Sequence, residues 1–235
     1  MSPVDNDDGD ARDARQLHHK LFHAHTDLPE HIAARRDAKR RLAEEARRLR
    51  EEAALVDAAE ANDGVLDEVA VALGELVSRL AGQPSLRKYG GLTFAPGFAG
   101  ALDERSPVSG QANPLAAPLR LWRDGDVVRG TAVYSAAYEG PPGTVHGGYV
   151  AAAFDEVVGV AQIVGGVAGL TGTLTVVMRK PTPLRTTIQY EGGLDRVEGR
   201  KIFVWAKSFA NGELTAEAQA IMIAPRMGSL PTHMN

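Results

Sequence analysis

Residues 143–166 read GTVHGGYVAAAFDEVVGVAQIVGG, a run that is apolar or small except for a few polar positions, among them two adjacent carboxylates, Asp155 and Glu156. This pattern predicts one helix over about 147–165 that is buried on most of its faces. Ionised carboxylates are costly to bury without partners. We therefore expect the helix either to leave one face open or to use a carboxylate for chemistry.

The composition of the whole chain narrows the range of functions. Of its 235 residues, 44% are hydrophobic and 24% are charged, as in an ordinary soluble globular protein. The formal net charge of -4 gives no general attraction to nucleic acid or to anionic membranes. The chain has no cysteine, which excludes disulfides, zinc-thiolate sites and thiol nucleophiles and fits a reducing, cytoplasmic location. We expect a small-molecule or protein partner and no nucleic acid.

The first residues of the chain do not resemble a signal peptide or a transit peptide. The first residues, MSPVDNDDGDARDARQ, are acidic and polar and lack the apolar stretch of a signal peptide. We expect a disordered acidic tail over residues 1–26 and a short C-terminal tail over 227–235. The longest apolar run is 143–166, but its glycines and its Asp-Glu pair argue against a membrane span.

Residues 27–86 are expected to form a helical N-terminal extension. A long helix is predicted from Pro29 to about Asn62, with Asp27 as its cap. Its arginines are each followed by a glutamate at i,i+4 spacing, which favours a solvated, self-paired face over a nucleic-acid patch. These pairs are Arg40 with Glu44, Arg41 with Glu45, Arg47 with Glu51, and Arg48 with Glu52. A second, amphipathic helix over about 66–80 has an apolar stripe that must pack on something.

The rest of the chain predicts a single α+β domain. Residues 87–118 are rich in Gly and Pro and are expected to be a loop-rich connector. Within 119–226 we expect a hairpin turning at Asp124-Gly125, its second strand running to about Tyr138, then the central helix and four more strands. The order indicates an antiparallel curved sheet wrapped around one long central helix.

The start of the central helix has the properties of an anion-stabilising site. It reads His146-Gly147-Gly148, and the first turn of a helix offers free N–H groups that a ligand carbonyl can approach closely over glycine. Asp155 lies a little over two turns further on and is expected to return to the same side, whereas Glu156 is rotated by roughly 100° and cannot serve the same spot. From the residues alone, a structural role for both carboxylates is as well supported as a catalytic role for Asp155.

Several motifs, in order, resemble a known family. His146-Gly147-Gly148 with an acid nine positions after the histidine resembles the hotdog-fold thioesterases of the phenylacetate-pathway and 4-hydroxybenzoyl-CoA type. The segments GPPGTVHGG, GLTGTLTVVMRKPTPL and LDRVEGRKIFV are similar to the subgroup that includes the mammalian carboxyl-terminal modulator protein. The resemblance covers about residues 107–225 and leaves the role of the N-terminal helices open.

The resemblance implies a set of site residues. Asp155 matches the catalytic acid, Gly147 the N–H that polarises the carbonyl, and Thr171 a catalytic threonine. By composition alone, Thr173 and Thr175 are equal candidates for that threonine. His146 is expected to play a supporting, orienting role.

Further positions are expected to contact the substrate. Gly148 would let it approach the backbone, and Lys180, Arg200 and Lys201 would hold CoA phosphates.

The resemblance further implies an acyl-CoA thioesterase that uses no metal or redox cofactor and acts as a homodimer or a dimer of dimers. A single hotdog sheet leaves an edge strand uncovered, and relatives form their sites across the dimer interface. The alternative is a non-catalytic module that binds acyl-CoA or an acyl chain and regulates a partner. A hydratase is a third option, for which the sequence lacks a suitable second acid-histidine set.

Overall fold

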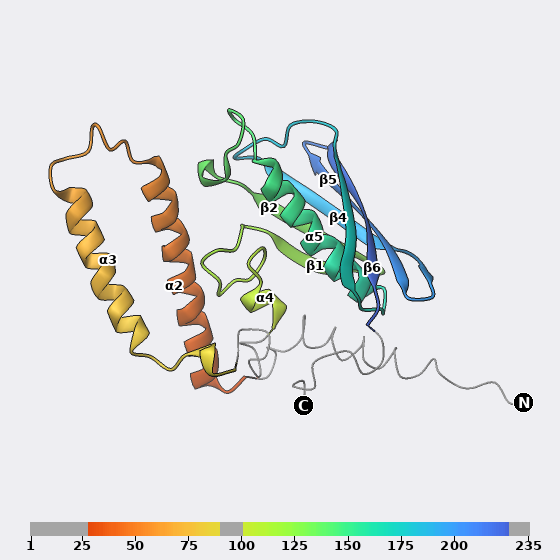
Figure 1. Cartoon of the computed structure of the whole chain (residues 1–235), viewed down its shortest axis with the longest axis horizontal. Helices are drawn as coiled ribbons and strands as arrows, with labels where there is room; N and C mark the ends of the chain where they lie inside the picture. Colours follow the sequence, from red (N-terminus) through yellow and green to blue (C-terminus); the bar gives the residue numbers. More distant parts are fainter. Residues whose placement is uncertain (1–27, 90–100, 226–235) are drawn as a thin grey trace, which may run out of the picture.

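The predicted α+β fold is confirmed by a computed structural model that describes residues 28–89 and 101–225. The expected tails and the Asp27 cap lie outside these residues. One antiparallel sheet has the strand order β1-β2-β4-β5-β6-β3, and the helix α5 crosses one of its faces (Figure 1). The strands are β1 (Arg120–Asp124), β2 (Val127–Val133), β3 (Leu170–Met178), β4 (Thr187–Glu198), β5 (Lys201–Ala210) and β6 (Glu213–Ile223).

The central helix α5 (Gly147–Val164) begins and ends where the glycines predict. At its end, Gly166 adopts φ 83°, a left-handed conformation that only glycine takes up readily, and its N–H donates to the Ile163 carbonyl. By length and composition α5 is the one described helix that could cross a membrane. It is instead the core helix of the domain, because Phe154, Val157 and Val158 are fully buried.

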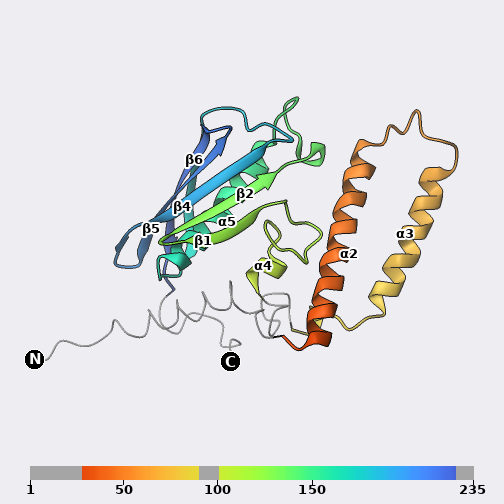
Figure 2. The same cartoon turned by 180° about the vertical axis from the view of Figure 1, so that it is seen from behind.

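Small residues let the sheet wrap closely around α5. Alanines on β5 and β6 face the helix, and all are buried. At Gly192 on β4 a Cβ atom would lie 2.9 Å from Cγ1 of Val157, so the glycine is needed for this close helix-sheet contact. The face of the sheet opposite α5 is covered by no described element (Figure 2).

Two details of the first hairpin differ from the prediction. The turn between β1 and β2 is formed by Gly125 and Asp126, one residue later than predicted, because Gly125 supplies the positive φ of 63° that the turn needs. The second strand ends at Val133, and a 3₁₀ turn, η3 (Ala136–Tyr138), follows it. This turn places Tyr138 beside the start of α5, where its carbonyl accepts a hydrogen bond from the His146 N–H.

The N-terminal extension forms two antiparallel helices, α2 (Glu30–Leu55) and α3 (Val65–Ala81). The first helix therefore ends earlier than the predicted Asn62. Both views show α2 between the sheet domain and α3 (Figures 1 and 2). The connector begins in a 3₁₀ turn, η1 (Leu86–Tyr89); its part from 101 to 118 contains a short helix, α4 (Leu102–Arg105), and lies between α2 and α5.

The prediction that the α2 arginines pair at i,i+4 along their own helix is wrong. Two of them bond to the connector and one to the sheet domain: Nε of Arg40 donates to Glu104 at 2.9 Å, Arg47 to the Asn113 carbonyl at 2.9 Å, and Arg50 to the Tyr138 hydroxyl at 2.6 Å. Their positions share the side of α2 on which Ala43 is buried. Arginine-glutamate pairs within the helix, Arg47 with Glu44 and Arg48 with Glu45, have i,i+3 spacing, and Arg36 pairs with its neighbour Asp37.

The apolar stripe of α3 is not covered by the described part of the chain. No residue of α3 is buried, and its large apolar side chains are mostly exposed. Those with the greatest exposure are Val71, Val77, Leu76 and Leu80. The sheet domain of the same chain is therefore not what this stripe packs on.

Candidate active site

The first turn of α5 has one free backbone donor rather than two. His146 is the N-cap, and its Nδ1 accepts a hydrogen bond of 3.0 Å from the Gly148 N–H. The Gly147 N–H has no acceptor among the described residues. Gly148, which we expected to contact the substrate, thus has its N–H occupied, and Gly147 retains the donor that could polarise a carbonyl. His146 serves the helix as a cap, in keeping with an orienting role.

Met178 is a residue of this region that the sequence did not indicate. A Cβ atom at Gly147 would lie 3.1 Å from Cε of Met178, at the end of β3. Met178 is 52% exposed although it is large and apolar. No sequence pattern marks it, because its position beside Gly147 depends on how β3 returns along α5.

Asp155 and Thr171 lie together on the open flank between α5 and β3. The Thr171 hydroxyl Oγ1 donates a hydrogen bond of 3.0 Å to Oδ1 of Asp155. Both residues are exposed in the single chain. Strand β3 is an edge strand, paired only with β6, so nothing in the sheet covers this flank. A carboxylate held by a hydroxyl and open on one side can accept a proton from water or attack an electrophile.

The structure separates Thr171 from the other two threonines of the strand. Thr171 pairs with Met222, whose side chain is buried on the α5 side of the sheet. Thr173 and Thr175 line a hollow on the opposite face, together with Trp205. Of the three candidates, Thr171 is therefore the one that meets Asp155.

Gly147 and Asp155 of one chain are too far apart to act on one carbonyl group. Eight residues separate them on one helix, which corresponds to about 12 Å at 1.5 Å per residue. A reacting carbonyl must lie about 3 Å from both its donor and the attacking group. The expectation that Asp155 returns to the donor of its own helix fails for the distance along the helix. Around the axis, eight residues also place the two positions about 80° apart.

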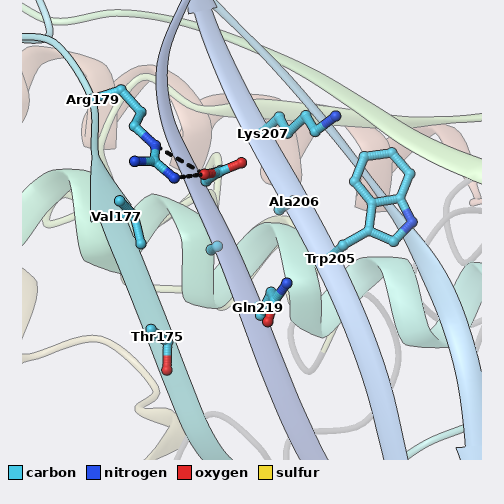
Figure 3. A pocket seen from close by; sticks show the side chains of 9 residues that line it. Thr175, Val177, Arg179, Trp205, Ala206, Lys207 and Gln219 are labelled. Atoms are coloured by element: carbon cyan, nitrogen blue, oxygen red, sulfur yellow. Dashed lines mark hydrogen bonds and ion pairs between the residues drawn. The ribbon is translucent and has the colours of Figure 1, made fainter.

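A second hollow on the outer face of the sheet is also separate from the candidate site. It has a volume of about 390 Å³ and is shown in Figure 3, where the Trp205 indole lies across the strands and Arg179 pairs with Glu217. At Gly193 a Cβ atom would lie 3.2 Å from the indole, so this glycine allows the ring to lie flat. The hollow is lined by none of Gly147, Asp155 and Thr171 and faces away from α5.

Sequence comparisons relate part of this chain to acyl-coenzyme A thioesterases. No family model matches the chain. Acyl-coenzyme A thioesterase THEM4 of Mus musculus is 38% identical over 87 residues, which are 36% of this chain and 37% of that protein. The Xenopus laevis protein of the same name is 36% identical over 89 residues, 36% of this chain and 39% of that protein. The chain thus spans less than two fifths of the length of these curated relatives.

A solved structure extends the relationship to most of the chain. A crystal structure of a thioesterase superfamily protein is 30% identical, with a TM-score of 0.67, and the match covers 79% of this chain and 94% of that one. The chain belongs to the hotdog-fold thioesterase superfamily. Its α5 is therefore the central helix of a hotdog fold, and the sheet wraps around it as the resemblance implied.

In this thioesterase-superfamily chain, Glu156 points away from the Asp155 flank. The Ser109 hydroxyl of the connector donates to Glu156 Oε1. Burial lowers the pKa of Arg105, and the nearby charge of Glu156 offsets part of that shift. Glu156 thus ties the connector to α5, which explains why a second carboxylate occurs in this apolar helix.

The three basic residues expected to hold CoA phosphates are not brought together in this hotdog domain. Lys180 Nζ forms an exposed ion pair of 2.9 Å with Glu213, where β6 begins. Arg200 donates to the Ala224 carbonyl at 2.9 Å, just beyond the end of β6, and Lys201 is its neighbour. Because β6 has 11 residues, the two ends lie about 33 Å apart. One chain therefore offers two separate basic positions.

Residues able to hold a metal do not gather in the described part of this domain. Within residues 28–89 and 101–225, no group of three or more His, Asp or Glu side chains is placed to bind an ion. The groups available to the candidate site are therefore the Asp155 carboxylate, the Thr171 hydroxyl and the Gly147 N–H.

Proposed function

We propose that the protein is an acyl-CoA thioesterase that hydrolyses a thioester to a free carboxylic acid and CoA. The observation that carries the proposal is the 3.0 Å hydrogen bond from Thr171 to Asp155 on the open flank of α5, with the free Gly147 N–H on the same helix. The similarity to proteins named acyl-coenzyme A thioesterases supports the choice of a thioester as substrate.

Each site is completed by a second copy of the chain. A twofold axis passing α5 near Ala151, midway between Gly147 and Asp155, sets the two helices antiparallel and brings Gly147 of one copy opposite Asp155 of the other. Gly148, Ala151 and Ala152 have small or no side chains, so the helices can approach closely. The unpaired edge of β3 lies alongside and can pair with its own copy. Two equivalent sites result.

The reaction then needs only these groups and water. The thioester carbonyl lies at the Gly147 N–H, which stabilises the negative charge that develops on its oxygen. The Asp155 carboxylate removes a proton from water as the water oxygen bonds to the carbonyl carbon. The carbon-sulfur bond breaks, and the thiolate of CoA leaves and takes up a proton. In the alternative route Asp155 attacks the carbonyl carbon itself, and water then hydrolyses the resulting anhydride.

Thr171 holds the carboxylate of Asp155 in place in either route. Its hydroxyl fills one acceptor position on Oδ1, which leaves the other oxygen to face the substrate. A residue in this role contributes to turnover more than to substrate binding.

A hydrolysis assay tests the proposal. Acyl-CoAs that range from short to long and from aliphatic to aromatic are incubated with the full chain, and thiol release is measured. We expect turnover of part of the panel and its loss in Asp155→Asn. Acyl-CoA binding without thiol release from any member would reject hydrolysis and favour the non-catalytic binding module. Absence of both would reject an acyl-CoA ligand.

A further inference from the structure

The return from α5 into β3 contains an irregularity next to Thr171. Thr171 pairs with Met222 of β6 and Thr173 with Ile221, its immediate neighbour, so Gly172 is an extra residue in the ladder. Such a bulge changes which side of the sheet the preceding residue faces.

Without the bulge, Thr171 would face away from Asp155. Leu174 and Val176 pair with Ala220 and Ala218, which are buried on the α5 side. Residues two apart in a regular strand share a face, so regular pairing would place residue 172 on the α5 side and Thr171 on the outer side. The bulge therefore brings the hydroxyl to the face that carries Asp155.

The bulge requires glycine at position 172. A Cβ atom there would lie 2.9 Å from Cγ1 of Ile223 and 3.2 Å from the Ile221 carbonyl oxygen. The second contact is with backbone, which yields less readily than the tip of a side chain. Alanine at this position would force β3 and β6 apart or remove the bulge.

Gln162 fixes the other end of the same return. Its side chain is only 4% exposed, and Nε2 donates to the Gly169 carbonyl at 2.9 Å, two residues before Thr171. Its Oε1 is buried and has no hydrogen-bond partner among the described residues. An unsatisfied buried oxygen costs free energy, so an apolar side chain at this position would be more favourable for packing alone. The presence of Gln162 therefore indicates that its Nε2 donor is needed. The donor holds the segment that leads into β3.

We propose that Gln162 and Gly172 are positioning residues that act through Thr171. Gln162 sets where β3 begins, Gly172 sets which way Thr171 faces, and together they bring its hydroxyl to Asp155. The inference rests on the proposed function for its kinetic consequence and stands independently for its geometry.

A mutant cycle tests the kinetic part. We expect Gln162→Met, which keeps the volume and removes the donor, and Gly172→Ala to lower kcat roughly tenfold each, with little change in KM, as Thr171→Ala does. In the Thr171→Ala background neither change should lower kcat further, because the hydroxyl they position is gone. Additive losses would overturn the proposal. Thr173→Ala, on the outer face, and Gly74→Ala, in open space on α3, are controls with unchanged kcat.

Crystal structures of the two variants test the geometric part without an activity assay. The distance from Thr171 Oγ1 to Asp155 should lengthen beyond hydrogen-bonding range in both. An unchanged distance would overturn the positioning role even if kcat falls. Conversely, a wild-type chain that hydrolyses no acyl-CoA would reject the proposed function, and a fully active Thr171→Ala variant would reject the kinetic role of Thr171. In both cases the crystallographic distances still decide the positioning.

Discussion

The two flanks of α5 carry adjacent carboxylates in opposite situations. On the β3 flank, Asp155 is exposed and, among the described residues, accepts a hydrogen bond from the Thr171 hydroxyl alone. On the connector flank, Glu156 is half-buried and accepts from Ser109, close to Arg105. One flank is open along an unpaired sheet edge, and the other is closed by the connector and α2. Two adjacent carboxylates on one helix thus have different environments, and we propose that the open one serves catalysis and the closed one stability.

The largest expected effect comes from the open flank. Asp155→Asn keeps the side-chain volume and removes the base or nucleophile, so kcat should fall by roughly 10²-fold or more. The melting temperature should stay close to that of the wild type, because Asp155 is exposed. Thiol release from an active acyl-CoA and a thermal melt measure both. A variant with normal turnover would remove the distinction between the flanks.

The open flank should also lose activity when the two copies are separated. Leu170 is 70% exposed on the edge strand, and Val177 is exposed near its other end. Charges on an edge strand oppose pairing with another edge, so Leu170→Lys with Val177→Lys should yield monomers. Because each site needs Gly147 from the other copy, kcat/KM should fall tenfold or more, within the range for a lost oxyanion donor.

Light scattering at micromolar concentration checks the mass, alongside the thiol-release assay. A monomeric wild-type chain with full activity would contradict a site shared between copies. Trp122→Gln provides a control, since this exposed apolar residue lies on β1 at the opposite edge.

Substitutions on the closed flank should lower the free energy of unfolding rather than the turnover rate. Arg40 is 26% exposed and donates to Glu104, whose side chain is 2% exposed. Arg40→Ala removes a charged partner from a buried carboxylate and should cost about 2–3 kcal/mol of unfolding free energy, less than for a fully buried pair because Arg40 is partly exposed. Arg48→Ala, which removes an exposed i,i+3 pair with Glu45, should stay within about 0.5 kcal/mol. Urea titrations compare them, and equal losses would mean that α2 is not anchored through Arg40.

A smaller loss is expected at Glu156 itself. Glu156→Gln keeps an acceptor for the Ser109 hydroxyl and removes the charge, which should cost about 1 kcal/mol, the difference between a charged and a neutral hydrogen bond. Turnover should change by less than about threefold, because Glu156 lies about 100° around the helix from Asp155. If Glu156→Gln slows hydrolysis as much as Asp155→Asn does, the carboxylates share one role and the two flanks are not distinct.

The sequence predicts the hotdog domain better than it predicts the N-terminal helices. The apolar run of α5, its flanking glycines and the turns between strands are local signals, and they give the fold and its element order. The residue pattern predicts the wrong partners for the arginines of α2 and does not identify a partner for α3. The polar helix α2 docks through Arg40, Arg47 and Arg50, because arginines can bond to loop carbonyls and to a buried carboxylate, whereas the apolar α3 buries nothing within the described chain.

In the candidate site, the residue types were predictable and their distances were not. The use of the Gly148 N–H by His146, the bulge at Gly172 and the separation of Lys180 from Arg200 depend on register and capping geometry. A one-residue change in register moves a side chain to the other face of a sheet. The amino-acid composition of a strand does not reveal its register. For this reason Thr171, Thr173 and Thr175 look equivalent in the sequence.

The smallest effect on the isolated domain is expected from α3. Leu66, Leu76 and Leu80 are each between 43% and 50% exposed, so replacing all three by Gln removes little buried apolar surface. The unfolding free energy should change by less than about 0.5 kcal/mol, and kcat should not change.

If α3 covers a second copy or another protein, the same triple variant will instead dissociate more readily or melt at a temperature that no longer depends on protein concentration. Leu73→Gln, at the half-buried position of the same helix, is the internal comparison, because it should cost more than any of the three exposed changes. A triple variant that unfolds several degrees lower at every concentration would show that α3 packs within its own chain, and the closed flank of α5 would then extend across both N-terminal helices.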